Sequence, residues 1–191
     1  MQISILDLEI NNIKSVYNAT KLFGNVNIVK NYKELKKSDI IILPGNGSFE
    51  SGIKALRTKY LIDVINNYFH QNKKIIGICL GLQLLMTSSE EGGLCDGLNL
   101  IKGKVIKINN KILKTPLLGW YEVDFKDNFF DKRDFFFNNN YMVDPNDKDC
   151  IVGYMEEVPA CLQKNCFTGF QFHPEKSSEY GLKILEKIIF E

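Results

Sequence analysis

The amino-acid sequence predicts an α/β fold. We expect a mainly parallel central sheet flanked by helices, with an added antiparallel or mixed layer of strands in the C-terminal half. In the first hundred residues, short apolar runs alternate with amphipathic segments, the pattern of a parallel sheet covered on both faces. From Leu100 onward, short apolar runs follow one another with polar turns between them. The chain has 191 residues, and we expect residues 1–191 to form a single domain.

The first half supplies the parallel strands and the helices that cover them. Four apolar runs predict strands at residues 3–6, 26–29, 39–43 and 75–78. Amphipathic or polar segments predict helices at residues 13–23, 33–37, 51–57 and 60–70. Asn11 or Asn12 can cap the first of these helices, and Gly24 can end it. A mostly apolar segment at residues 80–86 follows the fourth strand directly and suits a buried helix.

The second half predicts shorter strands and one closing helix. The strands are expected at residues 105–108, 121–125, 135–143, 151–155, 159–163 and 167–172. The closing helix is expected over residues 179–190, with Ser177 or Ser178 as its N-cap. The sequence contains no internal repeat, linker or low-complexity segment.

Composition excludes several classes of function. With 24 basic and 23 acidic residues, the chain carries no basic field to hold nucleic acid or a membrane surface. The opening residues lack the features of a signal peptide, and no apolar run reaches the length of a membrane span. The two histidines and unclustered cysteines indicate no metal site, and we expect no cofactor.

The cysteine content is five, an odd number without CxxC spacing. Cys161 and Cys166 flank a predicted hairpin turn, and a disulfide between them is one interpretation of this spacing. We expect a cytoplasmic enzyme whose cysteines are reduced.

Cys79 lies in a Gly-x-Cys-x-Gly pattern between the fourth strand and the apolar helix. This is the cysteine form of a nucleophile elbow, a sharp turn that lifts one reactive side chain above a sheet. Glycines at positions 77 and 81 allow the close backbone approach that such a turn needs. A lone cysteine in an apolar run is more often inert packing, and the glycines favour the nucleophile interpretation instead.

A thiol nucleophile needs a base, and the base needs an acceptor that orients it. His173 follows an alternating strand, with Glu175 two residues later on the same side of an extended chain. His70, the other histidine, has no acidic residue near it in the sequence. We therefore predict that His173 is the base and that Glu175 orients it.

The segments GICLGLQ and QFHPEKS, which contain Cys79 and His173, resemble those of class I (triad) glutamine amidotransferases. The resemblance covers nearly the whole chain. It implies the fold described above and L-glutamine as substrate, with Cys79, His173 and Glu175 as the catalytic triad that releases ammonia. A peptidase of related fold, or a non-enzymatic relative kept as a binding subunit, is a competing interpretation.

The same resemblance assigns further residues to the glutamine site. The loop PGNGSF at residues 44–49 is similar to the family's oxyanion loop, which implies that Asn46 and Gly47 stabilise the oxyanion. Taken alone, this loop is an ordinary turn. The family also implies that Glu91 binds the substrate ammonium and that Gln83 lines the pocket.

Within this family the chain most closely resembles the glutaminase subunit of imidazole glycerol phosphate synthase. The resemblance implies a (β/α)8-barrel synthase as heterodimer partner in histidine biosynthesis, with Asn12 and Trp120 at the interface. A core aromatic is the other interpretation of Trp120.

The sequence departs from the subunit's usual pattern in three regions. Leu117, Asn139 and Asn140 replace a histidine, a histidine and a serine, and Glu9 and Asn11 replace glycines. A paralogue that supplies ammonia to another acceptor, such as a nucleotide-sugar amidation enzyme, is therefore the alternative.

Overall fold

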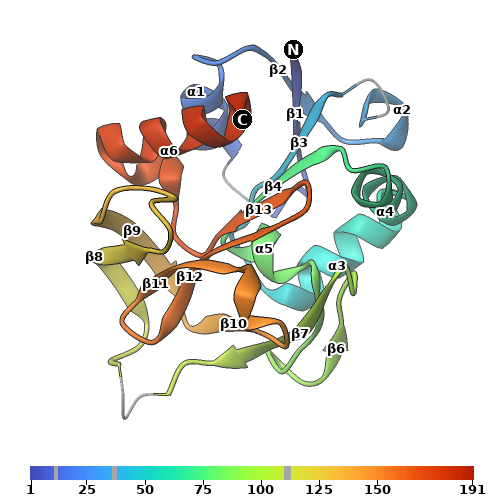
Figure 1. Ribbon diagram of the computed structural model, residues 1–191. Helices are drawn as coiled ribbons and strands as arrows, with labels where there is room; N and C mark the ends of the chain where they lie inside the picture. The colour runs from blue at the N-terminus through green and yellow to red at the C-terminus, as the bar shows by residue number, and fades with distance from the viewer. Residues whose placement is uncertain (11–12, 36–37, 110–112) are drawn as a thin grey trace.

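The computed structural model describes residues 1–10, 13–35, 38–109 and 113–191. Across these residues, a nine-stranded sheet forms the centre of the molecule (Figure 1). Five neighbouring strands are parallel, in the spatial order β2 (Asn25–Val29), β1 (Gln2–Leu6), β3 (Ile40–Leu43), β4 (Lys74–Ile78) and β13 (Phe167–Phe170). The predicted mainly parallel sheet is therefore confirmed.

Antiparallel strands extend this sheet beyond β13. In spatial order they are β12 (Val158–Lys164), β11 (Ile151–Met155), β8 (Leu117–Phe125) and β9 (Arg133–Asn139). A separate four-stranded mixed sheet contains β10 (Tyr141–Pro145), β7 (Ile101–Lys107), β5 (Met86–Ser89) and β6 (Cys95–Asp96). The antiparallel and mixed strands predicted for the C-terminal half are confirmed.

Helices cover both faces of the parallel strands. On one face, α1 (Ile13–Thr20) and α6 (Ser178–Phe190) pack in one apolar cluster and lie side by side in Figure 1. On the other, α3 (Phe49–Thr58) and α4 (Ile62–His70) pack in a second cluster. Strand β3 alternates between the two: Ile40 and Ile42 join the first cluster, and Ile41 and Leu43 join the second. This explains why the strand is apolar throughout.

Short helices complete the fold. They are α2 (Tyr32–Leu35), α5 (Leu80–Gln83) and the 3₁₀ turns η1 (Lys148–Cys150) and η2 (Pro174–Lys176). Among the described residues, no helix is long and apolar enough to cross a membrane.

Two predicted elements were wrong. The apolar segment 80–86 is helical only through Gln83, and Met86–Ser89 forms strand β5. The helix stops because the Leu84 and Leu85 carbonyls accept hydrogen bonds from Leu98, Leu100 and Ile101 instead of from a further turn. Residues 135–143 were expected to form one strand. They form the end of β9 and the start of β10, and these strands pair with different partners because the chain changes sheet at Asn140.

The N-cap position of the closing helix is as predicted, but the side chain there has another role. Ser177 occupies the N-cap position of α6, but its side chain makes no capping bond. Its hydroxyl instead donates to the His173 carbonyl at 2.6 Å and accepts from the Phe136 N–H at 2.9 Å. The serine therefore holds the histidine segment against β9.

The cysteines are all free, and each lies within the described residues. The hairpin between β12 and β13 turns at Asn165 and Cys166, later than predicted, and Cys161 lies opposite Phe170. The register therefore separates Cys161 from Cys166.

Parallel topology brings three loops to one edge of the sheet. β3, β4 and β13 are mutually parallel neighbours, so their C-terminal ends lie together. The segments that leave these ends are the loop from Pro44 to Gly47, the turn at Cys79 and the chain from Gln171 to Glu175. In open α/β sheets, ligands bind at this edge.

Candidate active site

Cys79 occupies the turn between β4 and α5 with φ 51° and ψ −107°. A non-glycine residue at positive φ costs energy, and such strain is typical of functional sites. The turn is packed too closely for side chains at its glycines: a Cβ would lie 1.9 Å from the Leu43 carbonyl oxygen at Gly81, and 2.8 Å from the Leu82 nitrogen at Gly77. The predicted elbow is present, although its helix has only four residues.

His173 and Glu175 form a buried pair at the end of β13. The His173 Nδ1 atom lies 2.8 Å from Glu175 Oε1, and their side chains are only 3% and 4% exposed. The backbone N–H of His173 donates to the Phe136 carbonyl at 2.8 Å, and Ser177 binds the His173 carbonyl from the other side. The imidazole is therefore fixed in orientation by neighbours on both sides.

The electrostatics of His173 favour a protonated ring. Burial lowers the pKa of His173, but the neighbouring Cys79 sulfur and the Glu175 carboxylate raise it more, to about 10. The second ring nitrogen, Nε2, has no hydrogen bond of full geometry within the described part of the chain, and it is shielded from solvent. The ring is thus suited to carry a proton and to give it to a reacting group.

The Cys79 side chain opens onto a pocket of about 190 Å³. Drug-sized pockets measure roughly 300–1,000 Å³, so this one suits a small molecule. Its lining is predominantly polar and comes from the loop after β3, the elbow, the segment before β6 and the link between β9 and β10. The lining residues are Asn46, Gly47, Cys79, Leu80, Gln83, Glu91, Asn138, Asn139, Asn140 and Tyr141.

Four residues predicted from the family pattern lie in this pocket. Asn46 and Gly47 line it, with Gly47 at φ 130°, a backbone conformation that favours glycine. Glu91 accepts a hydrogen bond from the Phe49 N–H at 2.8 Å, which fixes its carboxylate beside the first turn of α3. Gln83 donates to the Tyr141 carbonyl at 3.1 Å. The structure therefore brings them together with Cys79.

Of the two predicted interface residues, Trp120 lies within the described residues and Asn12 does not. Trp120 is 52% exposed, which excludes the core-aromatic interpretation. It lies on β8 two residues from Leu118, which is 61% exposed, so both side chains point to the same side of the strand. Asn12 lies outside the described residues.

The departures at residues 117, 139 and 140 lie in the core or line the pocket, whereas Glu9 is exposed and Asn11 lies outside the described residues. Leu117 is buried and pairs in register with Asn139 across β8 and β9. Asn139 is also buried, whereas Asn140 is exposed, and both line the pocket. Glu9 has φ 59°, a conformation that suits the glycine usual at this position, and its carboxylate pairs with Lys30 and Lys59 at 3.2 Å.

Sequence reasoning missed two parts of the site. One is Asn138 at the end of β9 with Tyr141 at the start of β10, because a single continuous strand was expected there. The other is Gln171, whose side chain is fully buried and reaches the Cys79 sulfur. Its polar side chain within the apolar, alternating run before His173 was the available signal.

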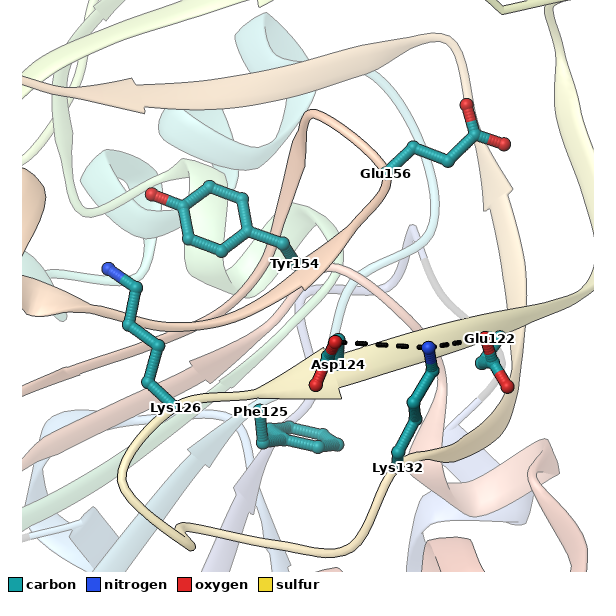
Figure 2. A pocket seen from close by; sticks show the side chains of 7 residues that line it. All are labelled: Glu122, Asp124, Phe125, Lys126, Lys132, Tyr154 and Glu156. Carbon is teal, nitrogen blue, oxygen red and sulfur yellow. Dashed lines mark ion pairs between the residues drawn. The ribbon is translucent and has the colours of Figure 1, made fainter.

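A second hollow, of about 530 Å³, lies beside β8 and β11 (Figure 2). Its charged side chains are largely exposed, and Lys132 pairs with Glu122 at 2.9 Å and with Asp124 at 3.8 Å. Exposed ion pairs contribute little energy, and no cysteine or histidine lines this hollow.

Within the described residues, no group of three or more His, Cys, Asp or Glu could hold a metal ion.

The chain is similar to known proteins over nearly its whole length. The chain is 37% identical to "Imidazole glycerol phosphate synthase subunit HisH 1" of Campylobacter jejuni strain RM1221, over 98% of each chain. It is 38% identical to "Imidazole glycerol phosphate synthase subunit HisH" of Methanocaldococcus jannaschii, again over 98% of each.

A solved structure titled "Crystal structure of glutamine amidotransferase" superposes with a TM-score of 0.82 at 14% identity, over 99% of both chains. Residues 4–191 match the family "Glutamine amidotransferase class-I". The chain therefore belongs to the class I glutamine amidotransferases and is an enzyme of that class.

Proposed function

We propose that this chain is a glutaminase subunit that hydrolyses L-glutamine with Cys79 as nucleophile, His173 as acid and base, and Glu175 as the residue that orients His173. The observation that carries the proposal is the buried 2.8 Å pair of His173 and Glu175 beside a strained elbow cysteine. Because the sulfur opens onto a small polar pocket, it can meet a substrate of the size of an amino acid.

The reaction balances with these groups alone. The Cys79 thiolate attacks the side-chain amide carbon of glutamine, a C–S bond forms, and the amide oxygen becomes an oxyanion beside Asn46 and Gly47. The His173 imidazolium then gives its proton to the amide nitrogen, the C–N bond breaks, and ammonia leaves. Water next attacks the thioester as His173 takes its proton, so the C–S bond breaks and glutamate and the thiolate are restored.

The pocket supplies a partner for the charged end of the substrate. Glu91 lines the pocket, and its Oε2 atom is held by the Phe49 N–H, which fixes the direction of the carboxylate. A fixed carboxylate can bind the α-ammonium group of glutamine in a charge-assisted hydrogen bond. Gln83, anchored on the Tyr141 carbonyl, supports the same wall.

We further propose that the ammonia passes to a (β/α)8-barrel synthase in histidine biosynthesis. The names of the full-length relatives support this, since they are subunits of imidazole glycerol phosphate synthase. The exposed side chains of Leu118 and Trp120 form an apolar patch on β8 suited to docking a partner. The ring centroids of Trp120 and Phe136 lie 6.2 Å apart, and those of Phe136 and His173 lie 6.5 Å apart. The patch is thus close to the triad.

The alternative, a paralogue that serves another acceptor, should differ on its docking face. Leu117 and Asn139 are buried, and Asn140 lines the glutamine pocket, so these three departures give no specific support to a changed partner.

Complementation tests the proposal. The chain is expressed with the barrel synthase of its own source in cells that lack their glutaminase subunit, on medium without histidine. We expect growth with the wild-type chain, and with Cys79→Ala we expect growth only when ammonium salt is added in excess. If the chain hydrolyses glutamine with a different partner and growth fails, the paralogue is correct.

A further inference from the structure

Gln171 lies between β13 and the catalytic histidine and has no role in the function described so far. Its side chain is completely buried, and its backbone N–H donates to the Ala160 carbonyl at 2.9 Å. A buried amide must satisfy its polar atoms within the protein, because an unpaired group costs about 1–3 kcal/mol. The partners of this amide therefore show what it does.

Hydrogen bonding fixes which end of the Gln171 amide faces the sulfur. The Tyr141 carbonyl can only accept, so the Gln83 amide must direct its NH₂ group toward it, at 3.1 Å. The same Gln83 nitrogen lies 3.2 Å from Gln171 Oε1, which acts as the acceptor. The Gln171 NH₂ group is then directed to the Cys79 sulfur, at 3.7 Å.

The sulfur has few other partners that suit a negative charge. The Asn138 carbonyl oxygen, 4.0 Å away, can accept from a neutral thiol but repels a thiolate. His173 supplies a positive charge, whereas Glu175 and Glu91 supply negative ones from η2 and from the pocket wall. The Gln171 amide thus adds a neutral donor that favours the thiolate over the thiol.

From this network we infer that Gln171 is a further catalytic residue, whose side-chain N–H donates to the Cys79 sulfur and stabilises the thiolate before attack. The inference rests on the proposed role of Cys79 as nucleophile. It also gives Gln83 a second task, because the Gln83 amide holds Gln171 in the donating orientation. The chain of amides connects the sulfur to the pocket wall at Tyr141.

The test measures the pH dependence of Cys79 alkylation by iodoacetamide, a small reagent that does not need the glutamine pocket. Gln171→Met keeps the approximate volume of the side chain and removes the donor. We expect the midpoint of the alkylation profile to move upward by about one pH unit, so that the rate at pH values below the wild-type midpoint falls about tenfold. The matched control is Gln163→Met, an exposed glutamine on β12, whose profile should equal that of the wild type.

Kinetics on glutamine supply a second readout. Because the donor acts on the sulfur and does not line the substrate pocket, Gln171→Met should lower kcat about tenfold with little change in KM. Gln83→Met should instead raise KM and move the alkylation midpoint upward by a smaller amount, since it acts on the sulfur through Gln171.

An unchanged alkylation midpoint in folded Gln171→Met protein, checked by circular dichroism, would overturn the inference. If that variant does not fold, an unchanged midpoint in Gln83→Met overturns it in the same way. Failure of the proposed function looks different: the alkylation midpoint of Cys79 would then still differ between wild type and Gln171→Met, but the wild-type protein would not turn over glutamine with any synthase.

Discussion

Replacing Gly81 by alanine tests whether the nucleophile depends on close packing between the elbow and the neighbouring strand. The added Cβ would lie 1.9 Å from the Leu43 carbonyl oxygen, whereas real Cβ contacts below 3.0 Å are essentially absent. The elbow and the end of β3 must therefore separate by at least 1 Å. The two atoms that this Cβ would meet below 3.0 Å are the Leu43 carbonyl oxygen and carbon. Both belong to the backbone, so no side chain can rotate to relieve the contact.

A displacement of this size has two measurable consequences. Misplacing catalytic groups by 1 Å lowers the rate about a hundredfold, and overpacking a close contact costs about 1–3 kcal/mol of stability. We expect both losses in glutaminase turnover measured with the partner synthase and in the free energy of unfolding measured in urea. Gly24→Ala is the control, because its Cβ would meet nothing nearer than 3.4 Å. Wild-type rate and stability in Gly81→Ala would refute the close-packed elbow.

Three further predictions concern charge and docking. In NMR titrations, His173 should remain protonated until the pH rises through about 10. Cys79→Ala should lower the pKa of His173, because the raising effect of the sulfur is lost while the lowering effect of burial stays. An unchanged pKa in this variant would exclude the interaction between His173 and Cys79. The loss of kcat in Glu175→Gln should be roughly tenfold to a hundredfold smaller than the loss in His173→Ala, because Glu175 orients the base without transferring the proton. Equal losses would contradict that division of roles. Trp120→Ala should weaken synthase binding at least tenfold in titration calorimetry, with little change in the urea midpoint, because the side chain is half exposed. Unchanged affinity would place the interface elsewhere.

The parallel half of the fold could be predicted because its signals are local. Strand β3 is apolar at every position, and a fully apolar run of that length bounded by Pro44 is typical of a buried parallel strand. The elbow was predictable because its signal is also local: a tight turn around Cys79 leaves no space for a Cβ at Gly77 or Gly81, and the glycines are visible in the sequence. His173 could be chosen over His70 because only His173 has a carboxylate at the spacing that an extended chain places on the same side.

The C-terminal half was harder to predict because its boundaries depend on distant partners. Asn140 separates β9 from β10, and the run of asparagines at residues 138–140 is a turn signal that the expected continuous strand overlooked. The change of sheet itself depends on the pairing strands β8 and β7, which lie earlier in the chain. The early end of α5 has the same origin: carbonyls of Leu84 and Leu85 bind amides from residues 98–101. Gln171 could be recognised as a polar residue in an apolar run, but its contact with the Cys79 sulfur could be found only in the structure, because the two residues are far apart in the sequence.

The measurement that most directly tests the proposed chemistry is covalent labelling with a diazoketone analogue of glutamine, in the presence of the partner synthase, followed by peptide mass spectrometry. The proposal predicts modification of Cys79 alone, at about one label per chain, with protection by excess glutamine. Labelling at Cys95, Cys150, Cys161 or Cys166, or labelling of Cys79 that glutamine does not prevent, would contradict it.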